Sequence, residues 1–328
     1  MKISLLICTY QRPDELRRLL ETLANQTVFP DEVIVVDGSL DDKTETVTKE
    51  TADIFGGGLF YFHVDETERG LTRQRNVGIK HAKGEIIAFL DDDTIPDKDY
   101  FKELLACFQR HSDAIGVGGT ITNEIEWKPA DMEKSPSLGM FRWEKWERRD
   151  DFRWRLRKLL KLDSPLPPGW MPSFGHGRPS NYPPDGNDYQ VEFVMGGASA
   201  WRKSIFDTYQ FSTYFYGYGL YEDLDFCIRA SRQGVIYLCT PAQLEHHHAP
   251  GGRPNQFQYG KMVVRNGWFV WRRRWPNLSF VSKAKWWLIT FLLAFLRSID
   301  FRNSGFKEST GRFWGMLTLL YNKPNINY

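Results

Sequence analysis

The sequence has only four cysteines among its 328 residues, and they lie far apart. Cys8, Cys107, Cys227 and Cys239 form no CxxC pair. This argues against a zinc ribbon, a dithiol redox motif and a scaffold held together by disulfides. We therefore expect a protein of a reducing compartment such as the cytosol.

Long apolar runs and an excess of one charge are also missing. The longest uncharged apolar segment near the C-terminus, 286–296, has eleven residues, whereas a helix needs about 20 to cross a bilayer. The first eight residues lack a small-residue cleavage site, so no signal peptide is expected. The net charge is +2, from 43 basic and 41 acidic residues, and gives no general reason to expect nucleic-acid binding.

The composition is that of a folded globular protein, with 41% hydrophobic and 26% charged residues. Strand-like and helix-like segments alternate over the first 120 residues. This alternation predicts an α/β fold with a largely parallel sheet, whose ligands bind at the carboxyl ends of the strands. Strands are expected at 3–8, 33–36, 59–64, 85–90, 191–195 and 235–239, and helices from residue 13, at 71–81 and at about 222–233.

Three consecutive carboxylates, Asp91, Asp92 and Asp93, follow one of the expected strands. Like charges held this close repel one another unless a cation neutralises them. In an extended chain Asp91 and Asp93 project to the same side, so both can offer oxygens to a hard divalent ion. A solvated strand end or a helix cap is the competing interpretation, and for an isolated triplet it would win roughly two times in three.

Four segments in order resemble the nucleotide-binding half of family-two glycosyltransferases, which have the GT-A fold. They are ICTYQRP at 7–13, VVDGS at 35–39, RQRNVGI at 73–79 and the strand that ends in the three aspartates. The resemblance implies a site for a nucleotide-diphosphate sugar, with UDP as the first candidate nucleotide. The residues expected to bind it are Thr9, Tyr10, Arg12, Asp37, Arg75, Asp91 and Asp92.

The resemblance also implies individual roles in this site. Asp37 would accept hydrogen bonds from the uracil or the ribose, and Arg75 would face the diphosphate, which suits an arginine fork. Asp91 and Asp93 would be metal ligands of the DXD motif, with Mn²⁺ or Mg²⁺ as the cofactor. For Asp37 an Asx turn before Gly38 explains the residue equally well.

A glycine-rich stretch in the second half of the chain, at 195–202, is similar to the segment that these enzymes place beside the acceptor. Glycines let the backbone approach a sugar or a phosphate closely. The acceptor-side residues expected from this similarity are Gly196, Gly197 and Trp201.

An acidic pair, Glu222 and Asp223, begins a segment that matches the family's ED-x-D-x-x-x-R pattern. In inverting members the acid of this pair is the base, so the resemblance implies that Asp223 deprotonates the acceptor. Glu222 is the alternate base or a positioning group. The plain alternative is an acidic helix N-terminus stabilised by the helix dipole.

Three histidines, His246, His247 and His248, follow the last expected strand. Neutral imidazole binds divalent metals together with carboxylates, and several GT-A families place a histidine here. We expect His246 to be the ligand, and His248 shares its side if the chain stays extended. A core or surface role has about even weight for such a cluster.

The C-terminal part of the chain changes composition sharply, because 249–299 contains nine basic residues and no acidic one. Interleaved tryptophans make either single-stranded nucleic acid or an anionic membrane surface a possible partner. The segment 286–296 is apolar nearly all round, which favours the membrane, and 313–321 could form a second such segment. A helical hairpin packed on the catalytic domain or on a dimer partner is the alternative.

The segment 123–190 mixes tryptophan, arginine and proline without sustained periodicity, which indicates an insertion. Its aromatic side chains would stack on acceptor sugars or form a second membrane patch. We expect a catalytic domain at 1–250, with a nucleotide-sugar half at 1–120, the insertion, and an acceptor half at 191–250. A basic, aromatic helical tail at 251–328 would follow.

These expectations combine into an α/β, GT-A enzyme with a C-terminal amphipathic helical extension. The resemblance implies metal-dependent, inverting transfer of a sugar to an acceptor hydroxyl, on a glycan or lipid-linked saccharide, at the inner face of the cell membrane. A sugar-phosphate nucleotidyltransferase is one alternative, although it would normally have a glycine-rich loop after the first strand. The other is a non-catalytic glycan- or membrane-binding module, against which intact Asp91, Asp93 and Asp223 speak.

Overall fold

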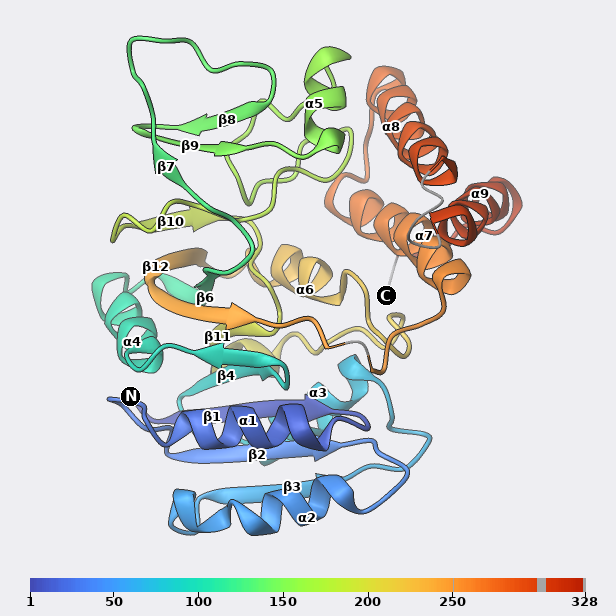
Figure 1. The fold of residues 1–328 in the computed structure, drawn as a ribbon. Helices are drawn as coiled ribbons and strands as arrows, with labels where there is room; N and C mark the ends of the chain where they lie inside the picture. Colours follow the sequence, from blue (N-terminus) through green and yellow to red (C-terminus); the bar gives the residue numbers. More distant parts are fainter. Residues whose placement is uncertain (250, 300–304, 327–328) are drawn as a thin grey trace. The chain divides into compact units, whose positions relative to one another are not determined.

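The computed structural model describes residues 1–249, 251–299 and 305–326, and the chain forms two compact units. Unit 1 comprises 1–126 and 180–252, and unit 2 comprises 127–179 and 253–328. Figure 1 traces the chain through both. The residues expected to form an insertion therefore group mainly with the C-terminal segment, which the sequence pattern does not predict.

The first half of unit 1 is the predicted βαβ arrangement. Strand β1 lies between β2 and β4, β3 follows β2, and all of these pairs are parallel. Nearly every residue of β1 and every residue of β2 is buried, as their continuous apolar runs predict. The bounds are β1 (Ile3–Thr9), β2 (Glu32–Asp37), β3 (Leu59–His63) and β4 (Ile86–Asp91).

The second half of unit 1 adds antiparallel pairs, so the α/β expectation is confirmed with a mixed sheet. Strand β11 lies between β4 and β6 and is antiparallel to both. Strand β12 is parallel to β6 and antiparallel to β10 and β5. The bounds are β5 (Thr94–Pro96), β6 (Ala114–Ile121), β10 (Asp188–Val191), β11 (Ala198–Arg202) and β12 (Val235–His246).

The strand predicted at 191–195 is wrong for most of its length. The structure places β10 at Asp188–Val191, where it pairs with the edge of β12. The chain must then cross to the slot between β4 and β6 that β11 occupies. Residues 192–197 make this crossing, which is why their apolar character does not produce a strand.

Helices pack against both faces of this sheet (Figure 1). Leu5 and Ile7 of β1 join a core with the apolar side of α1, whereas Leu6 between them meets α3 at Gly78. A Cβ at Gly78 would lie 2.3 Å from a methyl carbon of Leu6. The helices of unit 1 are α1 (Pro13–Leu23), α2 (Lys43–Glu50), α3 (Leu71–His81), α4 (Tyr100–Arg110) and α6 (Glu222–Ala230), with the 3₁₀ turns Ala52–Phe55 and Lys203–Asp207.

Unit 2 contains a small antiparallel sheet and four helices among its described residues. The sheet order is β7-β9-β8, and the buried Arg178 beside it pairs with Asp150 and Asp163. Helices α7 and α9 cross closely, since a Cβ at Gly260 would lie 2.0 Å from the carbonyl oxygen of Glu308. The bounds are β7 (Lys128–Pro129), β8 (Met140–Trp143), β9 (Trp146–Arg149), α5 (Phe152–Leu159), α7 (Gln256–Arg274), α8 (Phe280–Ser298) and α9 (Gly305–Tyr321).

The predicted helical tail is confirmed as α7, α8 and α9. Within the described ranges, none of the helices has the length and apolar character that a membrane crossing requires.

Candidate functional site

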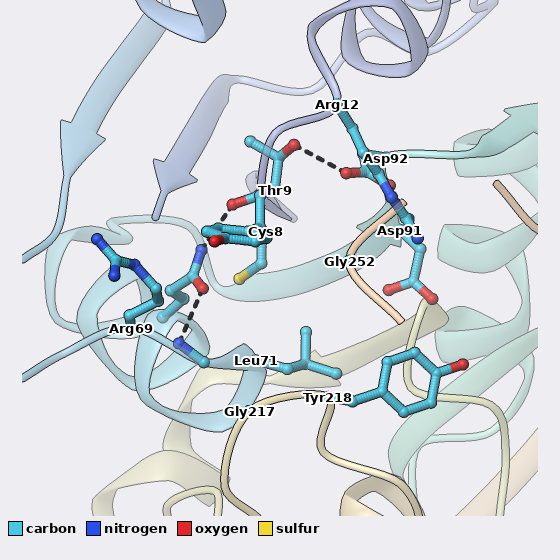
Figure 2. Close-up of a pocket in the computed structure, with 13 residues that line it drawn as sticks. Cys8, Thr9, Arg12, Arg69, Leu71, Asp91, Asp92, Gly217, Tyr218 and Gly252 are labelled. Atoms are coloured by element: carbon cyan, nitrogen blue, oxygen red, sulfur yellow. Dashed lines mark hydrogen bonds and ion pairs between the residues drawn. The ribbon is translucent and has the colours of Figure 1, made fainter. Parts of the chain in front are cut away.

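A pocket in unit 1 opens at the carboxyl ends of β1 and β4 and at the first turn of α3 (Figure 2). This is the edge of the sheet at which a parallel α/β arrangement collects its ligands. The loop at 217–218 and Gly252 close its other sides. The lining residues are Cys8, Thr9, Tyr10, Arg12, Arg69, Gly70, Leu71, Gln74, Asp91, Asp92, Gly217, Tyr218 and Gly252.

Of the residues expected to bind the nucleotide sugar, five line the pocket: Thr9, Tyr10, Arg12, Asp91 and Asp92. Thr9 Oγ1 donates a hydrogen bond to Asp92 Oδ2 at 2.8 Å, and Arg12 Nη1 donates to Asp92 Oδ1 at 2.8 Å. Burial raises the pKa of Asp92 to about 7 against the opposing effect of Arg12. Both Asp92 oxygens thus hold neighbouring side chains of the pocket in place.

Asp37 is fully buried and does not line the pocket. Its Oδ1 accepts a hydrogen bond from the backbone N–H of Ser39, which is an Asx turn, and its Oδ2 accepts one from the Tyr61 hydroxyl at 2.8 Å. Burial and the bond to Asp37 raise the pKa of Tyr61. The Asx-turn interpretation is therefore confirmed, and contact with the base or ribose stays a prediction.

Arg75 is also buried, and its guanidinium lies between two carboxylates. It is 2.5 Å from Glu222 Oε1 and 3.4 Å from Asp91 Oδ1, and it lies over the rings of Phe89 and Phe211. The expected contact with a diphosphate stays a prediction, because Arg75 does not line the pocket. What the structure shows is a cation that joins the end of β4 to the start of α6.

Of the two acidic residues at 222 and 223, Glu222 has the pKa that is shifted further from its ordinary value. Burial raises its pKa to about 8, although Arg75 opposes the shift. Its second oxygen, Oε2, is buried and has no hydrogen-bond partner within the part of the chain that the structure describes. This geometry fits the positioning role that the sequence left open for Glu222.

Asp223 is more accessible than Glu222 and lies at the start of α6. Its Oδ2 accepts a hydrogen bond from the Gly196 N–H at 3.1 Å, and its Oδ1 accepts one from the Leu224 N–H at 2.7 Å. Burial raises its pKa, which makes the carboxylate a stronger base than an exposed aspartate.

The two glycines at 196 and 197 make room for this cluster. A Cβ at Gly196 would lie 2.7 Å from Arg75 Nη1 and 2.8 Å from Glu222 Oε1. A Cβ at Gly197 would lie 2.0 Å from Asp91 Cγ. Contact of these glycines with an acceptor stays a prediction. What the structure shows is that the absence of a Cβ leaves space for the side chains of Arg75, Glu222 and Asp91.

Trp201 lies in the core of unit 1, with 2% of its surface exposed. Its ring packs edge-on against Phe226, and its indole N–H donates a hydrogen bond to Ser199 Oγ. Because almost none of the indole surface is accessible, Trp201 has no face to offer a sugar. We therefore leave it out of the site proposed below.

Asp91, Asp93 and His246 form a group whose ligand atoms all lie within 4.8 Å of one another. The Nε2 of His246 is 3.2 Å from Asp93 Oδ1, and Asp93 Oδ2 accepts a hydrogen bond from the Ala249 N–H at 2.7 Å. Although burial acts the other way on each, their mutual hydrogen bond and charges lower the pKa of Asp93 to about 2 and raise that of His246 to about 10.

This donor set fits a divalent cation. Two carboxylates and an imidazole are ligands that Mn²⁺ accepts. The negative charge that holds a proton on His246 would equally favour a metal ion, and the ion would displace that proton. The second histidine of interest, His248, belongs with Glu124 and His246 to an adjacent group.

Several site residues were missed from sequence. Arg69 donates from Nε to the Gly38 carbonyl at 2.7 Å and lies over the Tyr10 ring. Gln74 donates to the carbonyls of Thr9 and Val36, and so ties together the ends of β1 and β2. Gln74 belongs to the RQRNVGI string, but that pattern gave it no role.

Glu124 was missed as well. Its Oε1 is 2.8 Å from His248 Nε2 and 3.4 Å from His246 Nδ1. It follows β6, far in sequence from the histidines, and no spacing rule joins them. The Glu124 carboxylate thus lies beside the His246 nitrogen that is opposite the one facing Asp93.

Residues 4–164 match the model of the family described as glycosyl transferase family 2. A glucosyl-dolichyl phosphate glucuronosyltransferase from Haloferax volcanii is 32% identical over 124 residues, which are 37% of this chain and 38% of that protein. A poly(ribitol-phosphate) beta-N-acetylglucosaminyltransferase, TarS, from Staphylococcus aureus is 31% identical over 128 residues, which are 36% of this chain and 22% of that protein. The chain thus spans less than two fifths of the length of either relative.

Solved structures with a similar fold match nearly the whole chain. A mannosyltransferase from Pyrobaculum calidifontis, solved with GDP-Man and Mn²⁺, has a TM-score of 0.56 at 14% identity and covers 98% of this chain and 88% of its own. Residues 1–349 of S. aureus TarS give a TM-score of 0.54 at 15% identity, over 98% of this chain and 81% of the other. At this identity the similarity establishes the fold, which is the GT-A type that the sequence predicts.

Proposed function

We propose that the protein transfers a sugar from a nucleotide-diphosphate sugar to an acceptor hydroxyl, and the match of residues 4–164 to the model of glycosyl transferase family 2 supports this proposal. One observation carries the proposal. Asp91 lines the pocket, belongs to the candidate metal group and also pairs with Arg75 beside the acidic pair of α6. The nucleotide, the cation and the general base that deprotonates the acceptor can therefore all lie close to the Asp91 side chain.

The nucleotide would occupy the pocket, with UDP as the first candidate. Tyr10 offers a ring for the base, and Arg69, held over that ring, adds a positive charge near the ribose and phosphates. Asp91, Asp93 and His246 would hold Mn²⁺ or Mg²⁺. Such an ion neutralises charge on a diphosphate leaving group. The presence of Mn²⁺ and GDP-Man in a similar fold supports this assignment.

Asp223 is the proposed base of an inverting displacement. Its raised pKa and its position outside the pocket lining suit a group that receives the proton of the acceptor hydroxyl rather than one that binds the nucleotide. The oxygen freed of that proton attacks the anomeric carbon, and the nucleoside diphosphate leaves from the opposite face. Arg75 and Glu222 hold the end of β4 and the start of α6 together beneath this reaction.

The proposed acceptor is a lipid-linked saccharide or a growing glycan in polysaccharide synthesis. The names of two relatives, one with a dolichyl phosphate-linked sugar and one with a poly(ribitol phosphate), support this class of acceptor. An acceptor on a lipid would place the enzyme at a membrane surface, and we propose the inner face of the cell membrane.

The substitution Asp223→Asn tests the base assignment. We expect turnover to fall by a factor of about 10² to 10⁴, which is the usual contribution of a general base. The affinity for UDP with Mn²⁺, measured by calorimetry, should stay unchanged because Asp223 does not line the pocket. Transfer at a near wild-type rate would show that another group is the base.

A panel of UDP, GDP, TDP and CMP, each with and without Mn²⁺, tests the donor site in a thermal unfolding assay. We expect a nucleoside diphosphate to raise the melting temperature only when the metal is present. The variant Asp93→Asn should lose this dependence, whereas Asp223→Asn should keep it. If no nucleotide shifts the melting temperature in either condition, the proposed donor site is wrong.

A further inference from the structure

One side of α8 is an exposed apolar stripe. Val281, Leu288, Phe291 and Phe295 of α8, and Ile299 directly after it, are each 46–60% exposed. Their spacings of three, four and seven residues place them on a single side of the helix. The opposite side is buried, through Trp286, Ile289 and Ala294. The helix thus has one exposed and one buried side, although the segment 286–296 is apolar nearly all round.

Helix α9 carries a second stripe of the same kind. The rings of Phe291 in α8 and Phe313 in α9 are 5.8 Å apart, so the two stripes adjoin. Figure 1 shows the two helices in red tones beside α7. We call the combined surface the α8–α9 face. Its members on α9, each 36–70% exposed, are Phe306, Phe313, Trp314, Leu317, Leu320 and Tyr321.

The α8–α9 face is not needed to build the core of unit 2. The core side of α8 is filled by Trp286, which stacks on Trp271 of α7 with ring centroids 4.9 Å apart. Ser309 Oγ of α9 donates a hydrogen bond to the Ala294 carbonyl of α8 at 2.8 Å. Two helices that already pack on one side therefore keep large apolar side chains on the other, which marks an interaction surface.

The charge of the segment that carries this face is mostly of one sign. Residues 253–328 contain 13 lysines and arginines but only two acidic residues, whereas the rest of the chain has 30 basic and 39 acidic residues. The one acid of this segment among the described residues, Glu308, is 2% exposed and pairs with Arg297 and Arg312. Exposed lysines lie on both helices, at Lys283 and Lys307.

We propose that the α8–α9 face docks on an anionic lipid bilayer, with both helices lying in the plane of the headgroups. Apolar stripes beside lysines are what such an interfacial helix requires. Crossing the bilayer is a different arrangement, for which no described helix qualifies. A second copy of the chain fits less well, because it would bring together two copies of a segment that has 13 basic and two acidic residues. The proposal concerns unit 2 and does not rest on the glycosyl transfer assigned to unit 1.

The test is co-sedimentation of the full chain with lipid vesicles. One set contains phosphatidylcholine with about a third of phosphatidylglycerol, and the other contains phosphatidylcholine alone. We expect binding to the anionic vesicles that weakens as salt is raised, and much weaker binding to the neutral ones. The triple variant Phe291→Ser, Phe295→Ser, Leu317→Ser should bind anionic vesicles at least about tenfold more weakly, since it removes apolar area that enters the bilayer.

A matched control replaces three exposed apolar residues elsewhere in unit 2, in Met132→Ser, Leu138→Ser, Leu159→Ser; these side chains are 49–66% exposed. It should bind vesicles as the wild type does. Equal loss in both triple variants would overturn the proposal, and so would wild-type protein that stays in the supernatant. A dimer that the first triple variant converts to a monomer, without vesicle binding, would assign the face to a second copy instead. Nucleotide-dependent thermal stabilisation reports separately on unit 1.

A position-specific readout comes from Trp314, which is 47% exposed on the α8–α9 face. Vesicles with brominated acyl chains should quench part of the tryptophan emission of the wild type. The variant Trp314→Phe should lose a measurable share of that quenching while it still sediments with the vesicles. Identical quenching in the two proteins would place Trp314 outside the bilayer and contradict the proposed orientation.

Discussion

The substitution Gly197→Ala tests whether the carboxylate cluster depends on the close approach of β11 to β4. An alanine Cβ at this position would lie 2.0 Å from Asp91 Cγ and 2.1 Å from its Oδ2. Non-bonded carbons normally approach to about 3.5 Å, so the carboxylate must move by roughly 1.5 Å. The backbone has little freedom to move instead, because the Asp91 N–H donates to the Gly197 carbonyl at 3.2 Å and the next residues pair in the sheet.

The expected result is a large loss of activity with a moderate loss of stability. A displacement of this size in a catalytic group can lower the rate about 100-fold, and overpacking costs about 1–3 kcal/mol of unfolding free energy. Mn²⁺ affinity should fall too, since Asp91 leaves its place near Asp93 and His246. We would measure kcat/KM at several Mn²⁺ concentrations, and unfolding by urea in the same buffer.

The control for this experiment is Gly118→Ala on β6. Its Cβ would lie 2.5 Å from a methyl carbon of Val194, so it overpacks the sheet to a similar degree without touching a carboxylate. It should lose stability and keep most of its activity per folded molecule. A Gly197→Ala variant that retains kcat/KM within about threefold of wild type would contradict this prediction, and so would an equal loss of activity in both variants.

Three further predictions concern neighbouring charges. Burial raises the pKa of Glu222 to about 8 in the folded protein, whereas an ordinary glutamate has a pKa near 4.5. The unfolding free energy should therefore fall as pH rises through this window. Glu222→Gln should flatten this fall in metal-free urea titrations, and pH profiles of equal slope in the two proteins would contradict the raised pKa of Glu222. Glu124→Gln should weaken Mn²⁺ binding about tenfold in calorimetry, because it removes the negative charge that lies 3.4 Å from His246 Nδ1; unchanged affinity would argue against a role for that charge. Arg69→Ala should weaken UDP binding about tenfold through loss of the contacts to Gly38 and Tyr10, and equal affinity by calorimetry would remove Arg69 from the site.

Sequence predicted the parts of the fold that local patterns determine. The runs at β1, β2 and β4 are mostly apolar because these strands are buried on both faces, and α1 begins at Pro13 with acids in its first turn. The strand predicted at 191–195 failed because its apolar residues serve a crossing between strands rather than a place in the sheet. Strands as short as those of unit 2 leave too few residues for an alternating pattern.

For the candidate site too, the sequence predicts some residues and not others. The aspartate triplet and the acidic pair were recognisable because their members are neighbours in sequence. Glu124 and Arg69 were not, because each acts on residues that lie far from it in the chain. Trp201 belongs to a motif beside the site, but its side chain points into the core, and a motif alone does not indicate the direction of a side chain.

Neither unit is continuous in sequence, and this has a consequence for how the protein can be made. During synthesis the four parallel strands of unit 1 emerge first, but β11, which separates β4 from β6, arrives only after the segment 127–179 of unit 2. Until then β4 is an open edge and β6 lacks both of its sheet partners, so another nascent chain can add a strand to either. The carboxylate cluster likewise waits for Asp223 and His246. A ribosome that stalls between residues 126 and 198 would therefore expose an incomplete sheet that can pair with other chains. We expect chaperone binding to be greatest while this stretch is translated.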